Sequence, residues 1–294
     1  MNVKELIINM VKPINIPVTK LILKKHYQAN KPLSGTNNAM RVLILAPHMD
    51  DETIGPGGTV RLHANEGAEI HCVFITDGSN SVSDLPKEEL TKARQQEIDS
   101  VKDILGLTAI HYMGLPDGNV TSNELSQHKL KDMIMKINPD LIYCPLFVDA
   151  HRDHTATAQL LADTLEQLPA VDCAIRQYEI NCAIPPEQIN CIVDISDVYN
   201  VKEAAIEKFE SQAIAFDGFL ALNRIKANLV TQRIVAVESF LEHTTANYKQ
   251  HAKKINQDTY NFSKLFKQIN RTDTLLWAIY KNLNVKQTIY RKSR

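Results

Sequence analysis

The chain has 294 residues, of which 44% are hydrophobic and 23% are charged. These values are close to ordinary globular usage and exclude a disordered protein, a collagen-like fibre and a disulfide scaffold. The net charge of −1 hides an uneven layout: residues 1–40 carry +5, residues 241–294 carry +8, and the stretch between them carries −14. The sequence therefore predicts an acidic body with basic ends.

The five cysteines form no Cys-x-x-Cys pair, and most stand in apolar runs. They are expected to be reduced thiols in the core of a cytoplasmic protein. An apolar stretch over residues 6–18 is interrupted by Lys12, Pro13 and Pro17 before a secretory signal can form. It is also shorter than the roughly 20 apolar residues that a membrane span needs.

Strand and helix patterns alternate from residue 41 onward. Apolar runs predict strands over residues 42–46, 70–76, 110–115, 141–146, 174–180 and 192–195. Helical periodicity predicts helices over residues 59–65, 87–105, 125–137 and 155–168. After residue 194 the strands are expected to stop, and residues 198–212 and 219–243 are expected to be helical.

This order predicts an α/β fold: a Rossmann-like, mostly parallel sheet with helices on both faces and a helical C-terminal subdomain. The expected organisation is a basic N-terminal extension (1–40), a main domain (41–245) and a basic, mainly helical C-terminal extension (246–294). Ligands of such sheets bind at the carboxyl ends of the strands. Chemistry is thus expected just after residues 46, 76, 115 and 146.

Polar clusters follow the first and the fourth predicted strand. Residues 48–52 read His-Met-Asp-Asp-Glu and precede a glycine-rich turn at 55–58, and residues 149–154 read Asp-Ala-His-Arg-Asp-His. Adjacent carboxylates at the end of a buried strand repel each other, and burying them uncompensated is costly. A bound cation would remove that cost.

Two histidines and one carboxylate with an open position are typical of a catalytic metal site. The metal brings the pKa of a bound water towards ~7, and a neighbouring Asp is placed to take the proton of that water. The residue types do not assign the individual Asp residues to these tasks. The same ligand set also describes the facial triad of non-haem iron oxygenases, which remains an alternative.

Four motifs occur in a characteristic order: residues 48–52 with the glycine turn, Ile-Thr-Asp-Gly at 75–78, Arg-Gln-Gln-Glu at 94–97 and His-Arg-Asp-His at 151–154. They resemble the zinc-dependent N-acetylglucosaminyl deacetylases of the LmbE / PIG-L family. The resemblance covers about residues 41–212 and continues weakly through 237–240. It implies that the main domain, 41–245, is an LmbE-like deacetylase domain.

The resemblance also implies a division of labour. His48, Asp51 and His154 would hold the metal, which would be Zn²⁺ with Fe²⁺ as the alternative. Asp50 would be the general base.

The remaining roles implied by the family fall to three residues. His151 would stabilise the oxyanion and pass a proton to the leaving amine, and Asp153 would orient or tune His151 from outside the ligand shell. Arg94 would contact the sugar. The sequence departs from the family at Met49 and Arg152, where the family usually or often has Pro; neither position supplies a ligand.

The expected activity is that of a zinc-dependent amidohydrolase acting on a linear amide. A metal-activated water would remove the N-acetyl group from an N-acetylglucosamine-type conjugate. Thiol precursors, glycolipids, nucleotide sugars and polysaccharides all fit as substrates. A non-catalytic sugar-binding module of the same fold is the further alternative.

The basic ends favour no nucleic-acid partner, because the body is acidic and no recognition motif is present. They are either a solvated surface or a site of peripheral contact with an anionic membrane or glycan.

Overall fold

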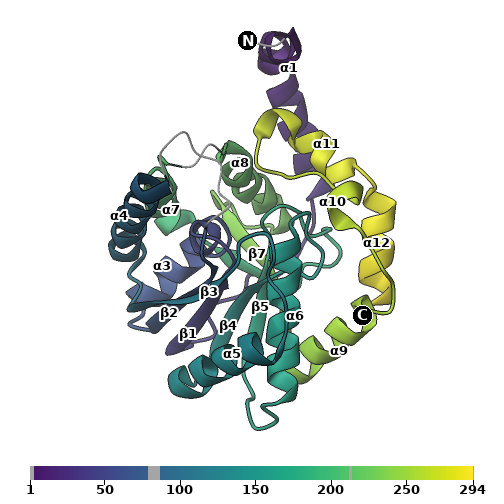
Figure 1. Cartoon of the computed structure of the whole chain (residues 1–294). Coiled ribbons are helices and arrows are strands. Elements are labelled where there is room, and N and C mark those ends of the chain that lie inside the picture. Colours follow the sequence, from purple (N-terminus) through teal and green to yellow (C-terminus); the bar gives the residue numbers. More distant parts are fainter. Residues whose placement is uncertain (1–2, 79–86, 212–213, 294) are drawn as a thin grey trace.

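The computed structural model describes residues 3–78, 87–211 and 214–293. Its centre is a seven-stranded sheet in the order β3-β2-β1-β4-β5-β7-β6 (Figure 1). The strands are β1 (Arg41–Ala46), β2 (Glu69–Thr76), β3 (Ala109–Leu115), β4 (Leu141–Pro145), β5 (Ala174–Tyr178), β6 (Cys191–Asp194) and β7 (Val237–Thr244). Strands β1 to β5 pair in parallel, whereas β7 is antiparallel to both β5 and β6.

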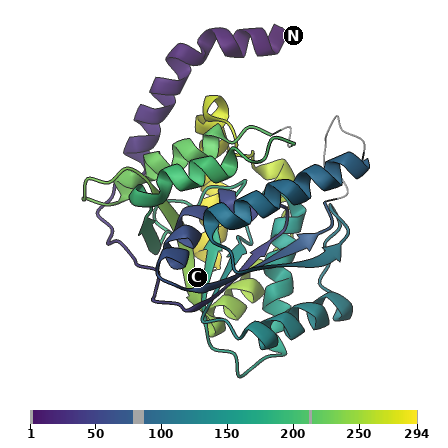
Figure 2. The same cartoon turned by 90° about the vertical axis from the view of Figure 1, so that its left-hand side faces the viewer.

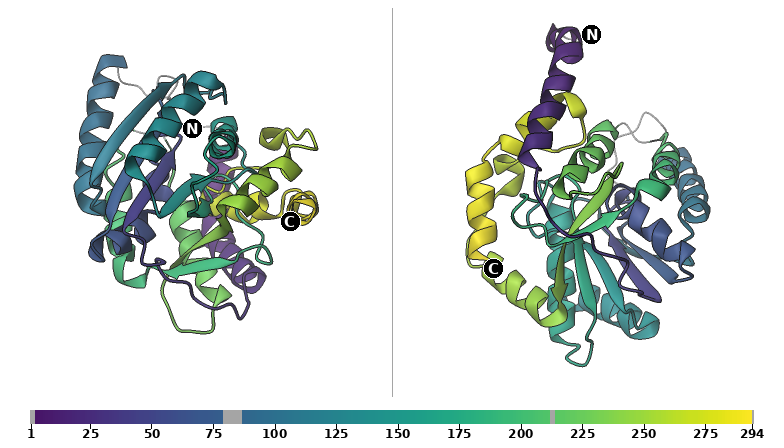
Figure 3. Two further views of the ribbon diagram at one scale, coloured as in Figure 1. Left: turned by 90° about the horizontal axis from the view of Figure 1, so that it is seen from below. Right: turned by 180° about the vertical axis from the view of Figure 1, so that it is seen from behind.

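Helices cover both faces of the sheet (Figure 3). On one face lie α3 (Gly57–Asn65), α4 (Lys87–Leu105) and α7 (Tyr199–Ile206), and on the other lie α5 (Glu124–Ile137), α6 (Arg152–Glu166) and α9 (Thr245–Ile255). The central strands are therefore buried on both sides, which explains their uninterrupted aliphatic runs. The predicted mostly parallel α/β fold is confirmed, and the five cysteines are free and buried as expected.

The prediction of a helix over residues 219–243 is wrong in its second half. Helix α8 (Asp217–Lys226) and a 3-10 turn, η2 (Ala227–Leu229), are followed by strand β7. This strand fills the gap between β5 and β6 and pairs with both of them. Pairing on two sides outweighs the helical spacing of its apolar residues, because strand preference depends mainly on packing against neighbours.

The segment after β6 also differs from the prediction. A 3-10 turn, η1 (Ser196–Val198), precedes α7, which ends at Ile206 rather than near residue 212. Position 212 lies outside the described residues. Strands therefore do not stop after β6, and the last strand of the sheet comes from beyond α7 and α8.

An N-terminal helix that the sequence did not predict, α1 (Val3–His26), projects from the body of the molecule (Figure 2). Pro13 and Pro17 lie inside this helix. Each removes a backbone donor, and α1 is visibly curved, as expected for a helix that contains proline. Within the described residues, no helix is long and apolar enough to cross a membrane.

The C-terminal region is mainly helical, as predicted. After α9 follow α10 (Phe262–Leu265), a 3-10 turn η3 (Thr272–Thr274), α11 (Leu275–Tyr280) and α12 (Leu283–Lys292). Two of its basic side chains contact the body: Lys253 pairs with Glu166, and buried Lys286 donates to the carbonyl of Ala183. Lys292 pairs with Asp258 within the region itself. The region is therefore a folded flank of the molecule.

Helix α8 approaches the C-terminal region closely at Gly218. The amide of Gly218 donates to the carbonyl of Asn270 at 3.0 Å. A Cβ atom at this glycine would lie 2.5 Å from the nitrogen of Arg271 and closer still to the carbonyl oxygen of Ile269. Only a residue without a side chain fits here, because both clashes are with backbone atoms.

Gly218→Ala is expected to lower the free energy of unfolding by about 1–3 kcal/mol, since an overpacked contact forces backbone shifts. Urea denaturation monitored by circular dichroism measures it. Gly35→Ala is the matched control, because the nearest atom to its added Cβ is 4.0 Å away. Equal stability of the two variants would contradict the close approach of α8.

Candidate metal centre and active site

The functional side chains lie at the carboxyl edge of the sheet, after β1, β3 and β4. The loop after β1 is held by Thr76 at the end of β2, whose amide and hydroxyl both donate to the carbonyl of Pro47, at 3.1 and 2.8 Å. A cavity of about 200 Å³ opens at this edge. Its polar wall contains six of the seven predicted site residues: His48, Asp50, Asp51, Arg94, His151 and His154.

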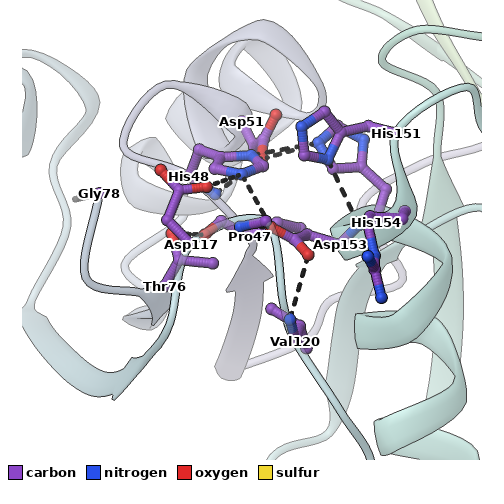
Figure 4. A network of polar contacts seen from close by, with 12 residues as sticks. Pro47, His48, Asp51, Thr76, Gly78, Asp117, Val120, His151, Asp153 and His154 are labelled. Atoms are coloured by element: carbon purple, nitrogen blue, oxygen red, sulfur yellow. Dashed lines mark hydrogen bonds and ion pairs between the residues drawn. The ribbon is translucent and has the colours of Figure 1, made fainter. Parts of the chain in front are cut away.

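Three donor atoms form a triangle in this cavity (Figure 4). The Nδ1 of His48 lies 3.2 Å from the Oδ2 of Asp51, and the Nε2 of His154 lies 3.3 Å from each of these two atoms. Donors about 2.0–2.1 Å from a shared tetrahedral zinc lie roughly 3.3 Å from one another. The donor set of two imidazole nitrogens and one carboxylate oxygen therefore fits a zinc ion without rearrangement.

Carboxylates behind the triangle orient both histidines. The Nε2 of His48 faces Asp117 at 3.4 Å and Asp153 at 3.5 Å, so its Nδ1 is left as the lone-pair donor. The Nδ1 of His154 faces Asp149 at 3.2 Å, which leaves its Nε2 for the metal. Such carboxylate–histidine pairs fix the tautomer and raise the basicity of a metal ligand.

The electrostatics of His154 follow from the same contacts. Burial lowers the pKa of His154, but the carboxylates of Asp51 and Asp149 outweigh it and raise the pKa to about 10. Burial alone would raise the pKa of Asp51, yet His154 and His48 hold that pKa well below its usual range. The triangle is therefore a site of strongly interacting charges in a water-poor environment.

Asp50 stands beside the triangle and lines the cavity. Burial, reinforced by the charge of Asp51, raises the pKa of Asp50 to about 7. A general base works best with a pKa near the working pH, so the environment of Asp50 suits proton transfer. Arg94 is buried on α4 in the same cavity, where its charge acts on Asp50, and its guanidinium lies 3.5 Å from the carbonyl of Gly78.

His151 is the N-cap of α6, and its Nδ1 accepts from the amide of Asp153 at 3.3 Å. This contact places the ring proton of neutral His151 on Nε2. Burial lowers the pKa of His151, and His154 and His48 lower it further. The ring stands edge-on to His48 with 4.7 Å between centroids, so its N–H donor belongs to the same cavity.

Asp153 contacts His48 as well as His151, for which the sequence predicts an orienting role. Its oxygens accept from the amides of Gly118 and Val120, at 2.6 and 3.1 Å, and face the Nε2 of His48. Only the backbone amide of Asp153 is hydrogen-bonded to His151. The carboxylate therefore buttresses a metal-facing histidine and joins the loop after β3 to α6.

Two carboxylates behind the triangle were not singled out from the sequence as site residues. Asp117 directly follows β3 in a turn-forming Pro-Asp-Gly stretch, and its signal was its position at the end of a parallel strand. Asp149 follows β4 and, besides facing His154, accepts from the amide of His151 and the side chain of Asn181. Asn181 comes from the loop after β5, a strand end that the sequence analysis did not consider.

The third acid of the run after β1 lies in different surroundings. Glu52 is completely buried and accepts from the hydroxyl of Thr53 at 2.6 Å. Burial raises the pKa of Glu52 to about 8, so this side chain is largely neutral at pH 7. Protonation thus removes the energetic cost of burying a charge at Glu52, whereas Asp51 keeps its charge.

A buried ion pair fixes the glycine-rich turn that follows these acids. Glu238 on β7 accepts from the amides of Gly58 and Thr59, at 2.8 and 2.7 Å, at the start of α3. Lys202 on α7 contacts Glu238 at 2.6 Å and also donates to the carbonyls of Ile54 and Gly55. One buried charge pair thus holds both sides of the turn.

Comparison with known proteins agrees with this geometry. Residues 43–165 match the sequence profile of the PIG-L family, described as GlcNAc-PI de-N-acetylase. A diacetylchitobiose deacetylase of Thermococcus kodakarensis is 28% identical over 206 residues, which are 65% of this chain and 76% of that protein. A probable N-acetyl-alpha-D-glucosaminyl L-malate deacetylase 2 of Bacillus anthracis is 28% identical over 142 residues, or 45% of this chain and 62% of that protein.

Solved structures show the same fold. N,N'-diacetylchitobiose deacetylase from Pyrococcus horikoshii, complexed with its inhibitor MPG, superposes with a TM-score of 0.64 at 25% identity and covers 72% of this chain and 86% of that chain. The conserved protein TT1542 from Thermus thermophilus superposes with a TM-score of 0.60 at 24% identity, covering 69% of this chain and 94% of that one.

The fold and the donor triangle define an open α/β protein with a His/Asp group at the carboxyl edge of its sheet that could hold a metal ion. The profile match, the relatives and the fold agree on one family: residues 43–165 form a domain of the PIG-L (LmbE-like) family. The family resemblance seen in the sequence motifs is thereby confirmed.

Asp149→Asn is expected to weaken zinc binding about 10–100-fold, because the partner that fixes the tautomer of His154 loses its charge. Competition titration against a chromogenic chelator measures the affinity. His128→Ala, at an exposed histidine on α5 paired with Asp132, is the control. An unchanged zinc affinity in Asp149→Asn would refute the role of this carboxylate.

Glu238→Gln is expected to destabilise the fold by about 3–5 kcal/mol, because it leaves the buried ammonium of Lys202 without its counter-charge. Denaturant unfolding measures the loss. Glu242→Gln is the comparison: that carboxylate also pairs with a buried cation, Arg176, but its side chain is 34% exposed. A smaller loss in Glu238→Gln than in Glu242→Gln would contradict the clamp.

Proposed function

We propose that this chain is a metal-dependent N-deacetylase that hydrolyses the acetamide of an N-acetylated amino sugar. The observation that carries the proposal is the donor triangle of His48, Asp51 and His154, with Asp50 and His151 facing the same cavity. The deacetylase names of the relatives support it. Residues 41–245 would form the catalytic domain.

His48, Asp51 and His154 would hold the metal, for which zinc suits the donor set and Fe²⁺ is the alternative. When bound, the ion supplies Lewis acidity, which polarises the amide carbonyl and makes a water nucleophilic near neutral pH. Asp117, Asp153 and Asp149 keep the two imidazoles in the tautomer that ligation requires.

The other side chains of the cavity carry the proton transfers. Asp50 accepts the proton of the attacking water, a task for which its raised pKa fits. The Nε2–H of His151 donates to the oxyanion that develops on the former carbonyl. His151 then passes this proton to the leaving amine, and the proton that Asp50 took from the water replaces it, so that His151 stays neutral. The C–N bond breaks, and acetate and a free amino sugar leave the cavity.

Arg94, which lines the cavity, would hold the sugar. Ile180 and Phe219 are among the cavity's apolar lining residues, and Gln268 comes from the C-terminal region. A lining that is partly apolar and partly charged suits a pyranose ring, which has an apolar face and a hydroxyl-bearing edge. Diacetylchitobiose and GlcNAc-malate, the substrates named for the relatives, are the first candidates.

The rival functions lack this support. A non-catalytic sugar-binding module would need neither a base nor an acid, yet Asp50 and His151 both face the cavity. An iron oxygenase would use the same triangle, but it has no need of a carboxylate whose pKa is raised to about 7 beside that triangle. The deacetylase assignment explains both features.

Asp50→Asn is expected to reduce acetate release by about 10²–10⁴-fold while zinc remains bound, because it removes the base and leaves the three ligands in place. Acetate is measured with zinc-loaded protein on N,N'-diacetylchitobiose and on GlcNAc-malate, and metal content by atomic emission.

Asp99→Asn, at an exposed carboxylate of α4, is the matched control and should keep full activity. Release of acetate that survives complete chelation of the metal would refute the mechanism. Failure of the zinc-loaded protein to cleave any N-acetylated amino sugar would refute the proposed activity.

A further inference from the structure

Helix α1 carries an apolar stripe on its outer face. Val11, Ile14, Val18, Leu21 and Ile22 are between 38% and 73% exposed, with Ile14 and Leu21 above 70%. Their spacing of three and four residues places them on one side of the helix. Large apolar side chains gathered in this way on a surface mark a contact with something else.

A different face of α1 holds the helix to the body. Thr19 and Leu23 are completely buried, and the side-chain amide of Asn15 donates to the carbonyl of Asp273 in η3 at 2.6 Å. The exposed stripe is therefore not a packing face of the described chain. Because α1 projects beyond the rest of the molecule (Figure 2), an extended surface can reach it.

The charges around the stripe are of one sign. Residues 11–26 contain four lysines and no acid, and Lys20, Lys24 and Lys25 are exposed. Lys20 and Lys24 also border a cavity of about 630 Å³ between α1 and α8, together with Arg224 and Arg233. The nearby acids are engaged: Glu203 pairs with Arg224, and Asp273 pairs with Arg271 and Lys12.

We propose that α1 docks on the surface of an anionic lipid bilayer. The helix lies in the plane of the interface, with Ile14 and Leu21 among the outer segments of the acyl chains and the lysines among anionic headgroups. An apolar stripe flanked by lysines is the arrangement that binds such interfaces, each basic residue near the surface contributing about 1 kcal/mol. Docking of this kind needs no membrane-spanning segment.

A second copy of the chain is the competing occupant, because positions 11, 14, 18 and 21 also follow a heptad spacing. Three features favour the bilayer. Pro13 and Pro17 bend the helix, whereas a coiled coil needs a regular backbone, and Ile22 widens the stripe beyond a two-position seam. The exposed lysines would also repel each other across a two-fold interface.

The test is co-sedimentation of the full chain with phosphatidylcholine vesicles with and without phosphatidylglycerol. The protein should bind the anionic vesicles and lose most of this binding at high salt. The double variant Ile14→Asp/Leu21→Asp should bind at least about tenfold more weakly, because two buried apolar contacts are lost. Lys20→Glu/Lys24→Glu should weaken binding to anionic vesicles through charge alone.

The matched control is Leu125→Asp/Met135→Asp, two exposed apolar residues on α5, which should bind like the parent protein. Thermal unfolding verifies that all variants are folded, and acetate release from a soluble sugar should be unchanged in each. Binding that is independent of anionic lipid, or of Ile14 and Leu21, would overturn the proposal. A dimer that Ile14→Asp/Leu21→Asp converts to monomer, without vesicle binding, would assign the stripe to a second copy instead.

Discussion

The position of the loop after β1 depends on one buried ion pair, that of Glu238 and Lys202. Both side chains are almost completely inaccessible to water, and removing two charges from water is costly. The cost is offset because Glu238 also accepts from the amides of Gly58 and Thr59, while Lys202 donates to two carbonyls of the preceding turn. These contacts lie directly after Asp51 in the chain. The ion pair therefore fixes where Asp51 and its neighbour Asp50 stand.

The clamp also explains why the sheet needs its last strand. Glu238 lies on β7, about 180 residues after the turn that it holds, and β7 follows α7 and α8 in the chain. Lys202 comes from α7, which packs against α2 (Asp51–Ile54) and α3. Segments that follow β1, β3 and β4 in the chain, namely α7 and β7, therefore help to hold the loop after β1 in place. Gln268, from the C-terminal region, lines the cavity directly.

The sequence was sufficient to predict what is local. The metal-facing residues follow buried strands within a few positions, so an apolar run ending in His and Asp indicates both the strand and the site. The contacts that hold the loop after β1 in place could not be predicted in this way. Glu238 meets Gly58 only through the tertiary fold, and the helical spacing around β7 concealed a strand whose pairing comes from β5 and β6. The contact of Asp153 with His48 could not be predicted for the same reason, since the two residues are near in space and distant in sequence.

The three consecutive acids after β1 show how surroundings divide the work among similar groups. All three are buried, and burial alone would raise every pKa. Asp51 faces two imidazoles and keeps its charge, which suits the metal ligand proposed here. Asp50 lacks that full compensation and reaches a pKa of about 7, which suits the proposed base, whereas Glu52 is completely buried and its pKa is raised to about 8. Divergent pKa values in neighbouring carboxyl groups point to separate acid–base roles, so one run of three residues supplies the proposed ligand, the proposed base and a buried acid because their surroundings differ.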